Sequence, residues 1–130
     1  MYTPRFALVF SILAVIAIVA YYCTPSAGTM VDVENASGAD ATVFVNFGSD
    51  SVVKPADWDF CTKTSDLACN FKLVSKARKP LPIGIRYLNA TFSFDKPLSC
   101  GVTKAEVNVN NTAWYDIVDI SLVDGYSNKI

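Results

Sequence analysis

The sequence contains no histidine among its 130 residues. Without an imidazole the chain cannot form a Ser-His-Asp or Cys-His catalytic pair, and it has no histidine ligand for zinc. A strong charge of either sign is also lacking, because 12 acidic residues oppose 11 basic ones and leave a net charge of −1. Nucleic-acid-binding domains are strongly basic, so the composition indicates no nucleic-acid partner. Any chemistry must come from carboxylates, tyrosines, lysines, arginines or thiols.

A helical repeat is missing as well, since no 3.6-residue period persists after residue 30. Short segments with β-branched and aromatic residues or alternating polarity recur instead, with Gly, Pro, Asn and Asp between them. This pattern predicts an all-β fold, an antiparallel β-sandwich. The predicted strands lie within 41–47, 70–75, 89–94, 104–110 and 118–122. Between them, 79–82 reads as a rigid, extended connection across a sheet edge.

The N-terminus carries the one long apolar run, Phe6–Tyr22, which follows Arg5. This arrangement is typical of a signal peptide, with cleavage after Gly28 or Ala27. An uncleaved transmembrane anchor is the alternative, because the run is nearly long enough to span a bilayer; lipidation at Cys23 is a third. All three place the remainder outside the cytosol, with membrane contact if the segment stays attached. The predicted organisation is a signal peptide or anchor over 1–28, a linker over 29–40 and one domain over 41–130.

Cysteine is scarce, and removal of the leader leaves Cys61, Cys69 and Cys100. In an oxidising compartment we expect one disulfide among them, although sequence alone cannot choose between the three pairings. The remaining thiol is free, pairs with a retained Cys23, or links two chains into a dimer. None of the spacings is a metal-binding pattern, and we expect neither a metal nor a cofactor.

Three glycosylation sequons are present, at Asn35, Asn89 and Asn110. In a eukaryotic secretory pathway Asn35 and Asn110 are the favoured acceptors, because Asn89 falls within a predicted strand.

The most informative stretch is 114–130, which places three aspartates in a strand-like apolar segment. Glu106 and Asp119 lie on the polar faces of two strands joined by a short connection, so a hairpin would bring them together. Asp124 would point to the opposite face of the strand, and it joins the pair only if the turn that it forms with Gly125 redirects its side chain. Paired carboxylates of this kind accept hydrogen bonds from sugar hydroxyls, or serve as acid and nucleophile in a glycosidase. A solvated face without a joint role is the third interpretation.

The segment from Asp119 to Asn128, DISLVDGYSN, resembles the YDVSLVDGFN signature of the thaumatin-like proteins, and 103–107, TKAEV, is similar to that family's TLAEF. The resemblance extends over roughly 41–130, with specific motifs in 103–130. Family members continue further and carry many more cysteines, so this chain resembles a short or truncated member.

The resemblance implies an acidic cleft lined by an Arg, a Glu and three Asp. Carried over, these are Glu106, Asp119 and Asp124, with Arg86 the best-placed arginine; the remaining Asp belongs to a part of the family fold beyond Ile130. It also implies a secreted, pathogenesis-related protein that binds β-1,3-glucan of cell walls, with antifungal activity or weak endo-glucanase activity. Trp114 or Tyr115 could then stack on a sugar ring. A membrane-tethered or disulfide-linked surface protein without glycan activity is the rival expectation.

Overall fold

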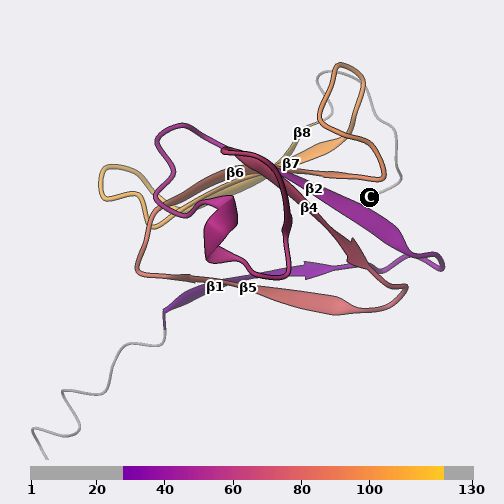
Figure 1. Cartoon of the computed structure of the whole chain (residues 1–130). Helices are drawn as coiled ribbons and strands as arrows, with labels where there is room; N and C mark the ends of the chain where they lie inside the picture. Colours follow the sequence, from indigo (N-terminus) through magenta and orange to yellow (C-terminus); the bar gives the residue numbers. More distant parts are fainter. Residues whose placement is uncertain (1–27, 122–130) are drawn as a thin grey trace, which may run out of the picture.

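The computed structural model describes residues 28–121, and almost all of its regular structure is antiparallel β-strand (Figure 1). The prediction of an all-β antiparallel fold is therefore confirmed. A single 3₁₀ turn, η1 (Pro55–Asp57), interrupts the series of strands. The strands are β1 (Thr29–Glu34), β2 (Ala41–Phe47), β3 (Thr62–Ser65), β4 (Ala68–Leu73), β5 (Arg78–Gly84), β6 (Leu88–Phe94), β7 (Lys104–Val109) and β8 (Ile117–Ser121).

The strands form two sheets, a six-stranded one in the order β3-β4-β2-β6-β7-β8 and a two-stranded one of β1 and β5. Figure 1 shows the β1–β5 pair as a separate layer beside the larger sheet, with η1 drawn between them. Val33 of β1 and Leu81 and Ile83 of β5 belong to the same buried cluster as the apolar side chains of the large sheet. The core therefore lies between the two sheets.

β2, a central strand of the large sheet, alternates between buried and partly exposed residues. Val43, Val45 and Phe47 are buried, whereas Phe44 and Asn46 point to the opposite face and are partly exposed. Successive side chains of a strand point to opposite faces, so one face of β2 supplies the core and the other faces outward. We call the side of the large sheet away from the core its outer face.

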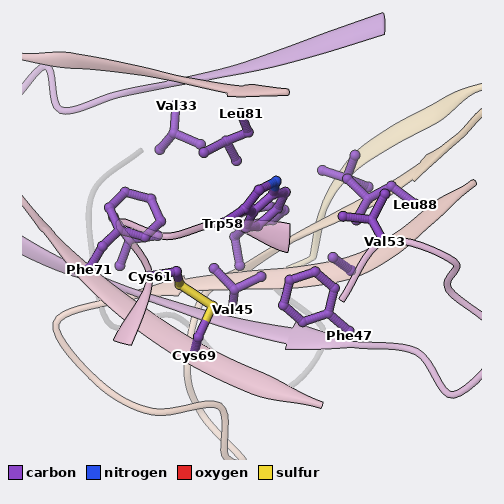
Figure 2. Close-up of a cluster of buried hydrophobic side chains, with 14 of the residues drawn as sticks. Val33, Val45, Phe47, Val53, Trp58, Cys61, Cys69, Phe71, Leu81 and Leu88 are labelled. Atoms are coloured by element: carbon purple, nitrogen blue, oxygen red, sulfur yellow. A yellow bond between two sulfur atoms is a disulfide. The ribbon is translucent and has the colours of Figure 1, made fainter. Parts of the chain in front are cut away.

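Trp58, just after η1, connects the two layers. Its side chain is 1 % exposed, and Figure 2 shows it between Val33 and Leu81 on one side and Val45 and Phe47 on the other. Its ring centroid lies 5.2 Å from that of Phe47, and its Nε1 donates a hydrogen bond to the Pro82 carbonyl at 3.2 Å. One indole thus contacts both sheets.

The β1–β5 sheet corrects two sequence predictions. The expected linker over 29–40 begins with strand β1, and the expected edge connection over 79–82 lies inside strand β5. The two strands pair from Thr29 opposite Gly84 to Glu34 opposite Arg78. Gly84 has φ +68°, a conformation that suits glycine, and its backbone approaches Gly28 so closely that a Cβ on Gly28 would lie 2.5 Å from it.

The predicted leader or anchor, 1–28, lies outside the described residues except for Gly28. Among the residues that are described, no helix has the length and apolar character needed to cross a membrane.

Candidate functional site

The predicted hairpin between Glu106 and Asp119 is present, because β7 and β8 pair antiparallel. Their register places Glu106 directly opposite Asp119. Directly opposed side chains in an antiparallel pair have Cβ atoms about 4.5–5.5 Å apart and point to the same face. The structure therefore brings these two carboxylates together on the outer face, and both side chains are exposed.

The acidic pair continues into a row of polar positions that crosses the sheet. Glu106 lies opposite Thr91 of β6, and Thr91 lies opposite Asn46 of β2. Thr91 and Asn46 are partly exposed, and within residues 28–121 neither side chain makes a hydrogen bond to a protein partner. Two carboxylates, a hydroxyl and an amide thus line up across four neighbouring strands. We call Asp119, Glu106, Thr91 and Asn46 the polar row.

The charges of this row are only partly compensated. Lys104 Nζ lies 3.2 Å from Glu106 Oε1, while Asp119 has no cation within 4 Å among the described residues. Like charges directly opposite each other in a sheet are destabilising. The fold therefore tolerates a small electrostatic cost at this position.

Arg86, the arginine assigned to the site by resemblance, is not brought to the acidic pair. Its Nη1 lies 2.6 Å from Asp57 Oδ1, beside η1, and its Nε donates to the Ile83 carbonyl. Burial opposes ionisation of Asp57, but the Lys54 N–H, at 2.7 Å from Oδ2, and the Arg86 guanidinium outweigh it and lower the pKa of that carboxyl. Arg86 and Asp57 form a structural ion pair that fixes η1 against the β5–β6 turn.

The structure does not place the other residues predicted for the site beside the acidic pair. Asp124 lies outside the described residues. Trp114 and Tyr115 lie in the β7–β8 connection and are 73 % and 91 % exposed. Asn110, where this connection begins, lies four positions after Glu106, which corresponds to about 13 Å along the strand direction. The two aromatic rings are thus accessible but belong to the end of the hairpin.

A second polar network, which the sequence did not reveal, borders the row on the outer face. The Asn108 amide donates to the Tyr87 hydroxyl at 3.0 Å, and that hydroxyl donates to Asp50 Oδ2 at 3.2 Å. Asn89 donates to Asp50 Oδ1 at 2.9 Å. The alternating patterns of β6 and β7 place Asn89 and Asn108 on the polar faces of their strands. Asp50, in contrast, comes from a turn far away in sequence, and no local pattern predicts that it lies beside them.

Of the three candidate disulfides, the structure contains Cys61–Cys69, which ties β4 to the segment just before β3. Both cysteines are buried in the core, whereas Cys100 is free and exposed on the β6–β7 loop. In the part of the chain that is described, no group of three or more Cys, Asp or Glu side chains is arranged to hold a metal ion.

All three sequon asparagines use their side-chain nitrogen within the fold. Asn35 is buried and donates to the carbonyls of Ala39 and Leu73. Asn110 donates to the carbonyls of Gly84 and Arg86, and Asn89 donates to Asp50. A glycan on any of these nitrogens would have to displace at least one hydrogen bond.

Comparisons of the chain with protein-family models, with curated proteins and with solved structures found no match.

Proposed function

We propose that this chain is a secreted, thaumatin-like carbohydrate-binding protein that recognises a cell-wall polysaccharide, β-1,3-glucan, through the outer face of its large sheet. In this proposal Glu106 and Asp119 accept hydrogen bonds from sugar hydroxyls. The resemblance of 103–107 and 119–128 to thaumatin-like motifs supports the choice of ligand class and a role in defence.

The observation that carries the proposal is the direct opposition of Glu106 and Asp119 on an open polar face. Carboxylates are planar acceptors that can bind two adjacent hydroxyls of a sugar ring. Thr91 and Asn46 add a hydroxyl and an amide to the same row. The electrostatic cost of opposing two carboxylates is understandable when a ligand uses both.

Binding to insoluble β-1,3-glucan tests the proposal. We expect the wild-type chain to sediment with the polysaccharide and the Glu106→Gln/Asp119→Asn variant to lose at least about tenfold in affinity, about 1.4 kcal/mol. Asp32→Asn/Asp59→Asn is the matched control, since it removes two exposed carboxylates elsewhere on the surface, one on β1 and one just after η1. Equal sedimentation of the wild type and the Glu106/Asp119 variant would refute the proposed site.

The stability of the same variant provides a second readout. Neutralising both carboxylates removes their mutual repulsion but also the ion pair between Glu106 and Lys104, two effects of similar size, so we expect the free energy of unfolding to change by less than about 0.5 kcal/mol. A loss of binding combined with unchanged or increased stability assigns the pair to function and not to folding. A large loss of stability would contradict that assignment.

Hydrolysis is the alternative activity, and the spacing of the pair favours it on one count. Opposed Cβ atoms about 4.5–5.5 Å apart are compatible with the ~5–5.5 Å between carboxyl groups in retaining glycosidases. A glycosidase also needs one carboxyl group held in a buried site as the acid. The side chain of Glu106 is 49 % exposed, so we favour binding. If the wild-type chain released reducing ends from laminarin between pH 4 and 7 and Glu106→Gln abolished this release, hydrolysis would become the favoured function.

The exposed thiol of Cys100 supports one further candidate, a disulfide-linked surface protein. If Cys100 joins two chains, non-reducing electrophoresis of the secreted protein gives a dimer band that Cys100→Ser abolishes. A monomer band for both proteins would remove this candidate.

A further inference from the structure

A hollow on the outer face lies at the far end of the polar row. It has a volume of about 250 Å³ and is lined by Phe44, Val45 and Asn46 of β2, Ala68 and Cys69 of β4, Thr64 of β3, and Pro97 of the β6–β7 loop. Asn46 belongs both to the hollow and to the row that contains Glu106 and Asp119. The two features therefore share one continuous surface.

The β6–β7 loop forms one wall of the hollow because it is held against the outer face. Ser93 is fully buried there, and its hydroxyl donates to the Lys96 carbonyl at 2.9 Å. Asp95 exchanges hydrogen bonds with Thr42 of β2, the backbone N–H of each residue being the donor. These contacts fix Pro97 near β2, so the wall is part of the folded structure.

The lining of the hollow matches one sugar ring in chemistry and size. The lining combines the apolar residues Phe44, Pro97 and Ala68 with the polar residues Asn46 and Thr64. A pyranose ring has an apolar C–H face and a polar rim, which aromatic and amide groups bind together. A volume of 250 Å³ is below the ~300–1,000 Å³ of sites that enclose drug-sized ligands, so it suits a single unit of a longer molecule.

We propose that the hollow at Phe44 and Pro97 binds a second unit of the same polysaccharide, which runs across the strands from Asp119 to Asn46. This inference rests on the proposed glycan-binding function. Neighbouring strands are about 4.8 Å apart, so the three strand-to-strand steps of the polar row span about 14 Å. A ligand that uses both ends must therefore be an oligomer, and its affinity must depend on its length.

Calorimetric titration of the full chain with linear β-1,3-linked glucose oligomers of two and six units tests this. We expect the hexamer to bind wild type about tenfold more tightly than the dimer. Ala68→Phe fills the hollow from β4, and Thr64→Phe narrows it from β3; in both variants we expect the two oligomers to bind with nearly equal affinity. Ala68→Ser preserves the space and should keep the tenfold ratio. Thermal unfolding of each variant identifies any that fails to fold.

The outcomes separate the two proposals. If both filled variants keep the tenfold ratio, or if wild type binds the two oligomers equally, the hollow is not a subsite while the acidic pair remains one. If Glu106→Gln/Asp119→Asn binds both oligomers like wild type, the proposed function fails, and if wild type binds neither, both proposals fail. Amide NMR shifts locate the contact directly, because only the hexamer should move Thr64 and Ala68.

Discussion

The side chain of Asn35 shows how much of this fold depends on single polar groups. It is 6 % exposed, its amide donates to the carbonyls of Ala39 and Leu73, and its oxygen accepts from the backbone and hydroxyl of Ser37. Replacement by Ala leaves the buried Leu73 carbonyl without this donor and removes the partly buried bonds to Ala39 and Ser37, so we expect a loss of about 1–3 kcal/mol in the free energy of unfolding. Urea denaturation measures this loss. A change below about 0.5 kcal/mol would contradict the role given to Asn35.

The same contacts bear on glycosylation, for which the sequence favoured Asn35. A glycan on the side-chain nitrogen is incompatible with keeping both of its hydrogen bonds, the partly buried one to Ala39 and the buried one to Leu73. When the chain is expressed through a eukaryotic secretory pathway, we expect the folded, secreted protein to carry no glycan at Asn35. Peptide mass spectrometry after glycosidase treatment in heavy-oxygen water tests this expectation. High occupancy of Asn35 in folded protein would overturn it.

Asp57 gives a pH-dependent contribution to stability. Its pKa in the folded protein is lowered below the usual 3.8 because the Lys54 N–H and the Arg86 guanidinium outweigh its partial burial. A lowered folded-state pKa contributes stability that is present above the unfolded-state pKa and lost as the pH falls through the folded-state value. We therefore expect Asp57→Asn to cost about 1 kcal/mol at pH 7 and progressively less below pH 4.

Chemical denaturation of wild type and variant at pH 7, 4 and 2.5 measures this difference. Asp59→Asn is the control, since Asp59 lies two positions after Asp57, is exposed, and makes no ion pair within residues 28–121. A stability difference for Asp57→Asn that stays constant down to pH 2.5 would exclude Asp57 as the titrating group.

At the level of elements, β-branched and aromatic composition predicted the strand over 41–47, and alternating polarity predicted the later strands that carry one apolar face. The strand over 41–47 has the bounds of β2, and Phe71 and Leu73 are buried while Lys72 is exposed, as expected. The hairpin of β7 and β8 follows from two such strands with a short connection. These elements are predictable because the burial of alternate residues imposes the same period on their sequence.

The β1–β5 sheet was missed for a physical reason. β5 contains Pro80 and Pro82, which lack the N–H needed in the interior of a sheet. Alternate residues of a strand direct their N–H to the same edge, so both prolines lose a donor on one side only. A two-stranded sheet leaves one edge of each strand unpaired, and β5 can place its prolines there. That arrangement depends on the partner β1, which no local pattern reveals.

Substitution of Leu81 tests how much the small sheet contributes to the stability of the core. Its side chain is fully buried on β5, so Leu81→Ala should lower the free energy of unfolding by about 2–5 kcal/mol. Met30 of β1 is 60 % exposed, and Met30→Ala should cost less than about 1 kcal/mol. Equal losses for the two variants, measured by urea denaturation, would show that the small sheet does not cover the core in solution.

For the molecule as a whole, part of the candidate site was predictable and part was not. The opposition of Glu106 and Asp119 follows from one hairpin, so parity along two adjacent strands was enough to infer it. Arg86, in contrast, is held by Asp57 from 29 residues earlier, and the hollow combines β2, β3, β4 and a loop. Such features depend on contacts between segments distant in sequence, where alternation within one strand carries no information.

The two sheets should unfold as one cooperative unit, because Trp58 contacts Phe47 in the large sheet and the Pro82 carbonyl in the small one. The sequence has two tryptophans, and the exposed Trp114 can be replaced to leave Trp58 as the sole reporter. In Trp114→Phe we expect the fluorescence transition of Trp58 and the far-ultraviolet circular dichroism transition to coincide in urea. Trp58→Ala should cost about 3–5 kcal/mol and move the circular dichroism transition as a whole to lower urea. A fluorescence transition that precedes the loss of strand signal would show instead that β1 and β5 separate first, leaving the large sheet folded without its second layer.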